Sequence, residues 1–161
     1  MKLSVQNLLW LPFLLAALWL VVFPIKDYDT FWHLANGKAM LDQGRIINEE
    51  IFSYSAYGTR FPNHSWLAQI VMALFYNVAG LAGLFAYKLV LTAGIFITVF
   101  LVSRRLGSDP LLAALAGYVS ILAGLSRYVV RPQLFGYLFL ALLAYVLYGY
   151  LLNRWHWSTL A

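Results

Sequence analysis

Two carboxylates and a histidine gather in one short stretch of the sequence, Lys26-Asp27-Tyr28-Asp29-Thr30-Phe31-Trp32-His33-Leu34. Five of the six acidic residues lie between Asp27 and Glu50, and the sixth is Asp109. The chain is 63% hydrophobic and still concentrates its carboxylates in one region. This distribution predicts an active site there, or the remnant of one.

The chemistry available to Asp27 and Asp29 is of two kinds. A carboxylate can take the proton of an acceptor hydroxyl, and an Asp-x-Asp pair can hold a hard divalent cation such as Mg²⁺ or Mn²⁺ through oxygen. His33 follows Asp29 by four residues, so on a helix the two share a face. The alternatives are structural: Asp29 as a helix N-cap, Asp27 as a solvated loop acid, and His33 as a hydrogen-bonded interfacial residue.

Three further residues of the same region are candidates for substrate binding. Glu50, beside Glu49, lies where the chain becomes extended and could hold an acceptor or a metal ion, although a solvated pair explains it as simply. His64 could orient an acid across the site, and its structural reading is the simpler one. Trp66 is most simply a membrane anchor.

Arg127 and Arg131 are four residues apart, at the end of an apolar segment and before Pro132. A guanidinium group presents a fork of N–H donors that suits phosphate oxygens, so the pair predicts a phosphate clamp. The alternative is that both side chains reach out to lipid headgroups.

The composition is that of an integral membrane protein. Of the 161 residues, 11% are charged and the mean hydropathy is +0.75, whereas soluble domains are about half apolar and a quarter charged. The absence of cysteine excludes disulfides, a thiol nucleophile and cysteine metal sites. The net charge of +5 comes from scattered basic residues, which argues against nucleic acid and favours membrane lipids or phosphates as partners.

The hydropathy pattern predicts one all-α, multi-pass membrane domain over residues 1–161. Four transmembrane helices are expected at residues 8–24, 84–102, 111–125 and 133–152, with Lys88 near a span end and able to reach the headgroups. Between the first two spans, residues 25–82 form a large loop.

Two helices that lie on the membrane surface are expected inside this loop. The first runs from Thr30 to about Gln43, with Asp29 as N-cap and Gly44 as the stop signal. The second runs from Trp66 to Ala79, and the rival interpretation is a span from Trp66 to Gly83. Residues 46–61 are expected to be extended or rich in turns.

Six fragments follow one another in a recognisable order. They are Asp29-Thr30-Phe31-Trp32-His33-Leu34-Ala35-Asn36-Gly37-Lys38, Gly44-Arg45-Ile46, Phe52-Ser53-Tyr54-Ser55-Ala56-Tyr57-Gly58, His64-Ser65-Trp66-Leu67-Ala68-Gln69, Gly80-Leu81-Ala82-Gly83-Leu84 and Arg131-Pro132-Gln133. Together they resemble the amino-terminal part of bacterial multi-pass glycosyltransferases of the GT-C type. These are the polyprenyl-phosphate-sugar-dependent relatives of the protein mannosyltransferases.

The resemblance implies a topology and a reaction. The first span runs outward through the bacterial inner membrane, and the large loop is extracytoplasmic. The enzyme transfers a hexosyl or pentosyl group from a polyprenyl-phosphate donor to a lipid, glycan or protein acceptor. On this pattern Asp29 is the base or metal ligand, Asp27 its partner, and Arg131 with Arg127 the phosphate clamp.

The basic residues weigh weakly against this orientation, because it places four of them inside and six outside. The sequence also departs from the family pattern at Ser65, where members resembling this chain often carry an acid. Such enzymes usually run to several hundred residues, so we expect a partial enzyme or one completed by a second membrane chain. The rival interpretation is a non-catalytic membrane subunit or a protein that binds a lipid phosphate.

Overall fold

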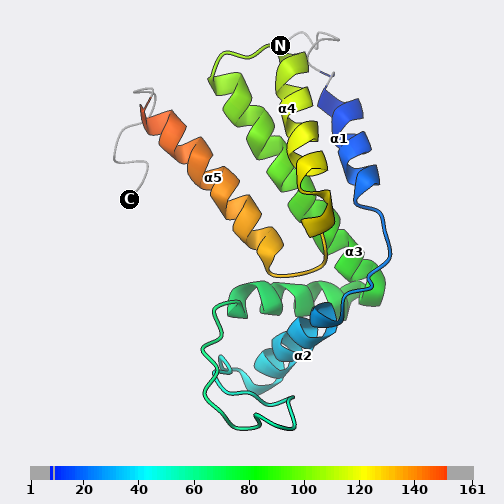
Figure 1. The fold of residues 1–161 in the computed structure, drawn as a ribbon, viewed down its shortest axis with the longest axis vertical. Coiled ribbons are helices and arrows are strands. Elements are labelled where there is room, and N and C mark those ends of the chain that lie inside the picture. Colours follow the sequence, from blue (N-terminus) through cyan, green and yellow to red (C-terminus); the bar gives the residue numbers. More distant parts are fainter. Residues whose placement is uncertain (1–7, 9, 152–161) are drawn as a thin grey trace. The chain divides into compact units, whose positions relative to one another are not determined.

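The computed structural model describes residue 8 and residues 10–151, and helices hold most of this part of the chain (Figure 1). The elements are α1 (Trp10–Leu20), α2 (Tyr28–Gln43), α3 (Trp66–Arg105), α4 (Pro110–Ala123), the 3-10 helix η2 (Leu125–Arg127) and α5 (Gln133–Leu151). Among the described residues no β-strand forms, and one isolated antiparallel bridge joins Glu49 and Arg60. The prediction of an all-α chain is confirmed.

The chain divides into two compact units. The polar unit consists of Pro24–Lys88 and Val129–Gln133, so α2 and the first part of α3 belong to it. The apolar unit consists of the remaining segments, namely Met1–Phe23, Leu89–Tyr128 and Leu134–Ala161. All five acidic residues between Asp27 and Glu50 fall in the polar unit, and Asp109 falls in the apolar one.

In the apolar unit, small residues and aromatic rings bring the helices together. α1 lies beside α4, and the ring of Phe13 meets Tyr118 edge-on at 6.2 Å between centroids (Figure 1). A side chain at Gly117 of α4 would press on the ring of Phe96 in α3, so glycine lets these helices approach closely. Ala113 and Ala114 of α4 are also fully buried.

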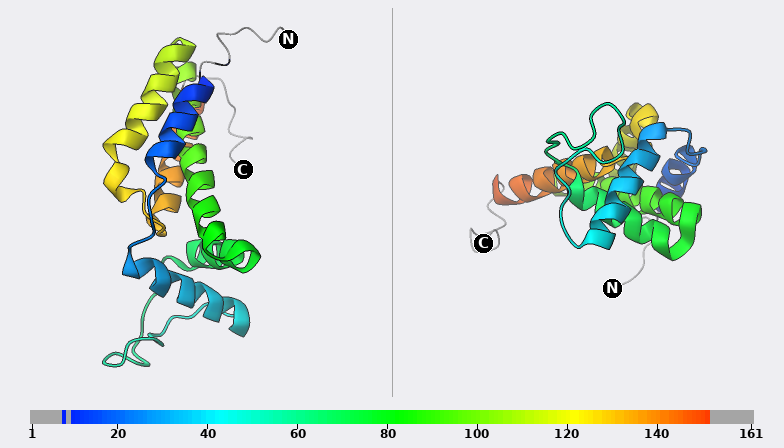
Figure 2. Two further views of the ribbon diagram at one scale, coloured as in Figure 1. Left: turned by 90° about the vertical axis from the view of Figure 1, so that its right-hand side faces the viewer. Right: turned by 90° about the horizontal axis from the view of Figure 1, so that it is seen from below.

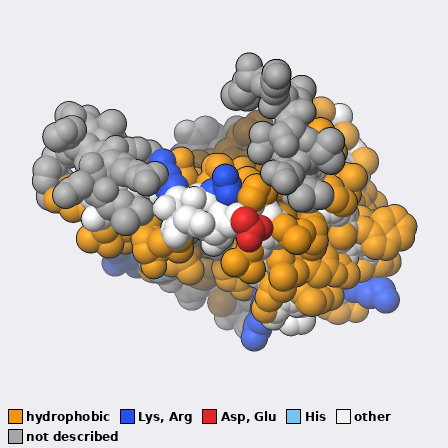
Figure 3. Space-filling model, turned by 90° about the horizontal axis from the view of Figure 1, so that it is seen from above, with side chains coloured by type: hydrophobic (Ala, Val, Ile, Leu, Met, Phe, Trp, Pro, Cys, Tyr) orange, Lys and Arg blue, Asp and Glu red, His pale blue; other side chains and the backbone are white. Residues whose placement is uncertain are grey.

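Two helices are long and apolar enough to cross a membrane, Trp66–Arg105 and Gln133–Leu151. The predicted spans 8–24 and 111–125 appear as shorter apolar helices, α1 with 11 residues and α4 with 14. Leu152, the predicted end of the last span, lies outside the described residues. In the view of Figure 3, apolar side chains make up most of the described surface.

In the polar unit, α2 starts earlier than expected. Its N-cap is Asp27, with extended backbone angles (φ −93°, ψ 120°) and a side-chain oxygen that accepts from the Asp29 N–H at 3.1 Å. The prediction that Asp29 caps this helix is therefore wrong, and Asp29 lies in the first turn, where its charge suits the helix dipole. Gly44 ends α2 as predicted, in the left-handed conformation (φ 62°).

α2 packs closely against the first part of α3 (Figures 1 and 2). A Cβ atom at Gly37 would collide with the backbone carbonyl of Gln69, so only glycine permits this approach. The ammonium group of Lys38 lies 4.1 Å from the centre of the Tyr76 ring, a cation–π contact across the same pair of helices. Buried apolar side chains on the two helices include Leu34 and Met40 of α2 and Met72 of α3.

A kink divides α3. Ala79 (φ −142°, ψ 19°) and Gly80 (φ 58°, ψ −134°) leave the helical conformation, and Gly80 has the positive φ that glycine adopts without strain. The predicted surface helix, Trp66 to Ala79, thus ends where the chain breaks. Its placement on or across a membrane stays a prediction.

Two other details of the polar unit bear on the predictions. Residues 46–61 are rich in turns as expected, and the bridge between Glu49 and Arg60 is flanked by the Glu50 N–H···O=C Thr59 bond of 2.9 Å. Lys88 was expected to reach lipid headgroups, but its side chain is 1% exposed and lies near the Phe85 ring. That prediction is wrong, because Lys88 is almost completely buried.

Candidate functional site

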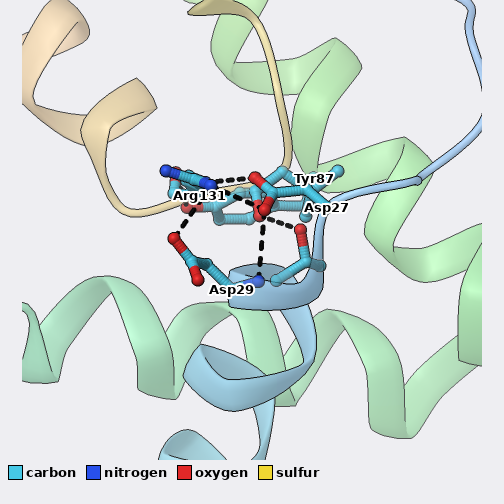
Figure 4. A network of polar contacts seen from close by, with 6 residues as sticks. Asp27, Asp29, Tyr87 and Arg131 are labelled. Carbon is cyan, nitrogen blue, oxygen red and sulfur yellow. Dashed lines mark hydrogen bonds and ion pairs between the residues drawn. The ribbon is translucent and has the colours of Figure 1, made fainter.

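The site is built where a short connecting segment, residues 129–133, meets the start of α2. The Thr30 hydroxyl, fully buried, donates to the Val130 carbonyl at 2.8 Å. The Tyr87 hydroxyl of α3 donates to the Arg131 carbonyl at 3.5 Å, a longer contact (Figure 4). These two bonds fix the backbone of the segment, so that the Arg131 side chain extends over the first turn of α2.

Arg131 binds both aspartates of the Asp-x-Asp pair (Figure 4). Its Nε donates to Oδ2 of Asp27, and its Nη2 donates to Oδ1 of Asp27 at 2.6 Å, a bidentate pair. The same Nη2 lies 2.8 Å from Oδ2 of Asp29. These contacts use Nε and Nη2, and within the described part of the chain no contact is made by Nη1. Two N–H donors of the guanidinium are therefore available to a bound molecule.

The ion pair shifts the acidity of both partners. The hydrogen bond from Arg131 lowers the pKa of Asp27, against the opposing effect of burial, and the Asp29 N–H lowers it further. The hydrogen bond to Asp27 likewise raises the pKa of Arg131. Asp27 is thus a carboxylate and Arg131 a guanidinium at any physiological pH.

The two aspartates differ in accessibility. The Asp27 side chain is 17% exposed and the Asp29 side chain 60% exposed, with Arg131 at 29%. Both oxygens of Asp27 already accept hydrogen bonds, whereas Asp29 shares one oxygen with Arg131. Asp29 is therefore the carboxylate that can meet a substrate, and Asp27 is the one that holds Arg131.

His33 lies one turn beyond Asp29 on α2, half-buried, and its ring is held from two sides. Its Nδ1 is 3.0 Å from Nε2 of Gln69, and the Trp32 ring meets it edge-on at 5.0 Å. Burial lowers the pKa of His33, and the charge of Asp29 opposes that shift. The neutral imidazole is therefore the favoured form of His33 at neutral pH.

Two residues of this site were not predicted from the sequence, Gln69 and Asn63. Gln69 is fully buried and Asn63 is 6% exposed, and the Asn63 side-chain amide donates to Oε1 of Gln69 at 2.7 Å. The sequence does carry a signal for Gln69, since it is an amide within the apolar segment that follows Trp66. A buried amide needs a partner, and here the partner is His33.

Within the described part of the chain, the remaining predicted residues make no hydrogen bond or ion pair with the aspartate pair. Glu50 accepts from the N–H groups of Phe52 and Ser53 at 2.8 and 2.9 Å, so its carboxylate closes a turn. His64 and Trp66 are exposed at the start of α3, with Trp66 38% exposed. Arg127 is exposed and belongs to the apolar unit.

A divalent cation at Asp27 and Asp29 would have to displace Arg131, which occupies both oxygens of Asp27. Among the residues that the structure describes, no three histidine or acidic side chains converge as metal ligands. In this structure the aspartate pair is a guanidinium site, with Arg131 bound to both carboxylates.

No protein-family model matches the chain, and no curated protein or solved structure is similar to it at a significant level. The resemblance to GT-C enzymes therefore stays a prediction from the six sequence fragments.

Proposed function

We propose that this chain is the amino-terminal part of a GT-C-like membrane glycosyltransferase. It transfers a hexosyl or pentosyl group from a polyprenyl-phosphate donor to a lipid, glycan or protein acceptor at the outer face of the bacterial inner membrane. The observation that carries the proposal is the Arg131 guanidinium held between Asp27 and Asp29, with Asp29 more than half exposed. In the proposed architecture, α1, α4, α5 and the part of α3 after the kink cross the membrane.

The aspartates and Arg131 suit the two charges that develop during glycosyl transfer. The proton of the acceptor hydroxyl moves to Asp29, and the acceptor oxygen bonds to the anomeric carbon of the sugar. The bond from that carbon to the phosphate oxygen breaks, and the polyprenyl phosphate leaves with the electron pair. The two free N–H groups of Arg131 Nη1 then stabilise the phosphate oxygens.

Asp27 supports this chemistry by holding the Arg131 guanidinium in place. Its bidentate bonds hold the guanidinium plane in one orientation, so that Nη1 is presented without a search through rotamers. The two carboxylates outnumber the one guanidinium, which leaves a local negative charge. The proposed reaction uses Arg131 in place of a divalent cation.

The test is sugar transfer and donor binding by the protein in nanodiscs, with a labelled polyprenyl-phosphate sugar. Asp29→Asn is expected to lower the transfer rate by about 100-fold or more while changing donor affinity little. Arg131→Gln is expected to weaken donor binding by roughly tenfold or more, because the charge-assisted contact to phosphate is lost. Asp109→Asn, an exposed aspartate of the apolar unit, is the matched control and leaves both unchanged.

Two outcomes would contradict the proposal. Binding equal to that of empty nanodiscs would show that the chain by itself is no donor site. Saturable binding that Arg131→Gln weakens, without sugar release by the unmodified protein, would favour the rival function of a lipid-phosphate-binding subunit. Addition of EDTA is expected to change neither binding nor transfer.

A further inference from the structure

A row of four hydrogen-bonding groups in the polar unit fixes the protonation of His33. The row starts at the backbone N–H of Ser65, which donates to Oδ1 of Asn63 at 3.2 Å. The Asn63 Nδ2 donates to Oε1 of Gln69 at 2.7 Å, and Gln69 Nε2 lies 3.0 Å from His33 Nδ1. In this row, each side chain therefore has a defined donor end and a defined acceptor end.

The direction follows from the first group, which cannot be reversed. A backbone N–H is always a donor, so the Asn63 atom facing it must be the oxygen. The Asn63 NH₂ then faces Gln69, which must offer its own oxygen there. The Gln69 NH₂ is left to face His33, and Nδ1 must accept.

An Nδ1 that accepts a hydrogen bond cannot carry a proton, so the proton of the neutral ring is on Nε2. A doubly protonated ring would set an Nδ1–H against the Gln69 N–H. Burial and this contact act in the same direction, and the pKa of His33 is lowered. Asp29, Arg131 and Asp27 are the charged groups that interact with the ring. In the described part of the chain, Nε2 has no hydrogen-bond partner.

We infer that His33 is held as the neutral Nε2–H tautomer and acts as a hydrogen-bond donor to an oxygen of the bound ligand, with Asn63 and Gln69 as its positioning residues. A general base would need the opposite arrangement, with an unprotonated nitrogen facing the ligand. Of His33 and Asp29, only Asp29 then takes the proton of the acceptor hydroxyl. The ligand part of this inference rests on the proposed function, in which Asp29 and Arg131, whose charges act on the His33 ring, meet sugar and phosphate oxygens.

The tautomer is measurable without any reaction, by nitrogen-15 NMR of histidine-labelled protein in nanodiscs. The spectrum at neutral pH is expected to show the His33 ring with a protonated Nε2 and an unprotonated Nδ1. His33→Gln identifies the signal by its loss. A protonated Nδ1 in the unmodified protein would overturn the inference directly, and this measurement needs no variant that might misfold.

Gln69→Glu reverses the last bond while keeping the side-chain shape. A carboxylate accepts from Asn63 and also from His33, so the His33 proton is expected to move to Nδ1 and its pKa to rise. Gln43→Glu adds the same charge at an exposed position near the end of α2 and is the matched control, with no change of tautomer. An unchanged tautomer in folded Gln69→Glu would overturn the role of Gln69.

The donor role is tested by adding polyprenyl phosphate to the nanodiscs. The expected result is a shift of the His33 Nε2 signal, with Nδ1 nearly unchanged, and Gln69→Glu abolishes the shift. A shift at Nδ1 alone, or none at saturating lipid phosphate, would overturn the donor role. Absence of sugar transfer alongside the Nε2 shift would remove the proposed enzyme activity and keep His33 as a phosphate donor.

Discussion

Two helices of this chain begin at an aspartate, and the two aspartates have different surroundings. Asp109 caps α4 by accepting from the N–H groups of Leu111 and Leu112 at 2.9 and 3.0 Å, and its side chain is exposed. Asp27 caps α2 by accepting from one N–H and also accepts two hydrogen bonds from Arg131. Asp109 only caps the start of its helix, whereas Asp27 caps its helix and also joins two distant segments of the chain.

The difference shows that a capping signal alone does not separate an acid that only caps a helix from one that also binds a cation. Both residues are aspartates that directly precede a helix, and both satisfy N–H groups of its first turn. What distinguishes Asp27 is partial burial together with a cation from a residue 104 positions away. That combination costs solvation and is found where a site must be held in one geometry.

The largest expected effect is that of Asp27→Asn against Asp109→Asn. Asparagine caps a helix about as well as aspartate, so both variants keep the cap and lose only the charge. Asp27→Asn is expected to lower the free energy of unfolding by about 1.5–3 kcal/mol, and Asp109→Asn by roughly 0.5 kcal/mol or less. Denaturant unfolding in detergent micelles measures both. Equal losses would mean that the Arg131 pair adds nothing beyond the cap.

A double-mutant cycle isolates the pair itself. Asp27→Asn and Arg131→Gln, alone and together, are expected to give a coupling energy of about 1–2 kcal/mol, because the two side chains share two hydrogen bonds. The matched cycle is Asp109→Asn with Arg104→Gln, since Arg104 donates to the Ser108 carbonyl at 2.6 Å. Its coupling is expected to be near zero. Coupling of the same size in both cycles would contradict the comparison.

Acid should remove the contribution of Asp27. The folded state lowers the pKa of Asp27, so the unfolded chain binds more protons and stability falls as the pH falls. The loss begins near the ordinary aspartate value of 3.8 and continues down through the lowered pKa. Unfolding measured across this range is expected to be steeper in the unmodified protein than in Asp27→Asn. Parallel curves would show that Asp27 keeps an ordinary pKa in the folded state.

The smallest effect is expected where an ion pair exists without burial or capping. Arg45 and Glu49 are four residues apart in the loop after α2, with the Arg45 Nη2 2.7 Å from the Glu49 Oε1 and side chains 56% and 42% exposed. Arg45→Gln is expected to change the unfolding free energy by about 0–0.5 kcal/mol, because water screens the pair. The same denaturant series measures it. A loss comparable to that of Arg131→Gln would mean that partial burial is not what strengthens the Asp27 pair.

Local patterns in the sequence predicted much of the helical framework. Gly44 ends α2 as expected, and the helix starting at Trp66 breaks after Ala79. Both boundaries are set locally, because in each case a glycine with a positive φ interrupts the helix. The N-cap was displaced by two residues, because Asp27 and Asp29 are chemically equal candidates and only the backbone angles distinguish them.

The candidate site was predicted in part. The sequence predicts all four residues of the ion-pair region, Asp27, Asp29, His33 and Arg131. It does not predict the contact between Arg131 and Asp27, because no spacing pattern relates residues so far apart in the chain. The order Ser65, Asn63, Gln69, His33 was missed for the same reason, since it joins α2 to the start of α3. Periodicity places a side chain on a face, and it does not say which face of another helix it will meet.

The long sequence separation between Asp27 and Arg131 sets an order of events during synthesis. The pair spans 104 positions, so at about 5–20 residues per second the ribosome adds Arg131 roughly 5–20 s after Asp27. During that interval the two neighbouring carboxylates lack their cation, and the α2 end of the polar unit stays incomplete. The nascent chain therefore closes this unit only after the segment preceding α5 has been made.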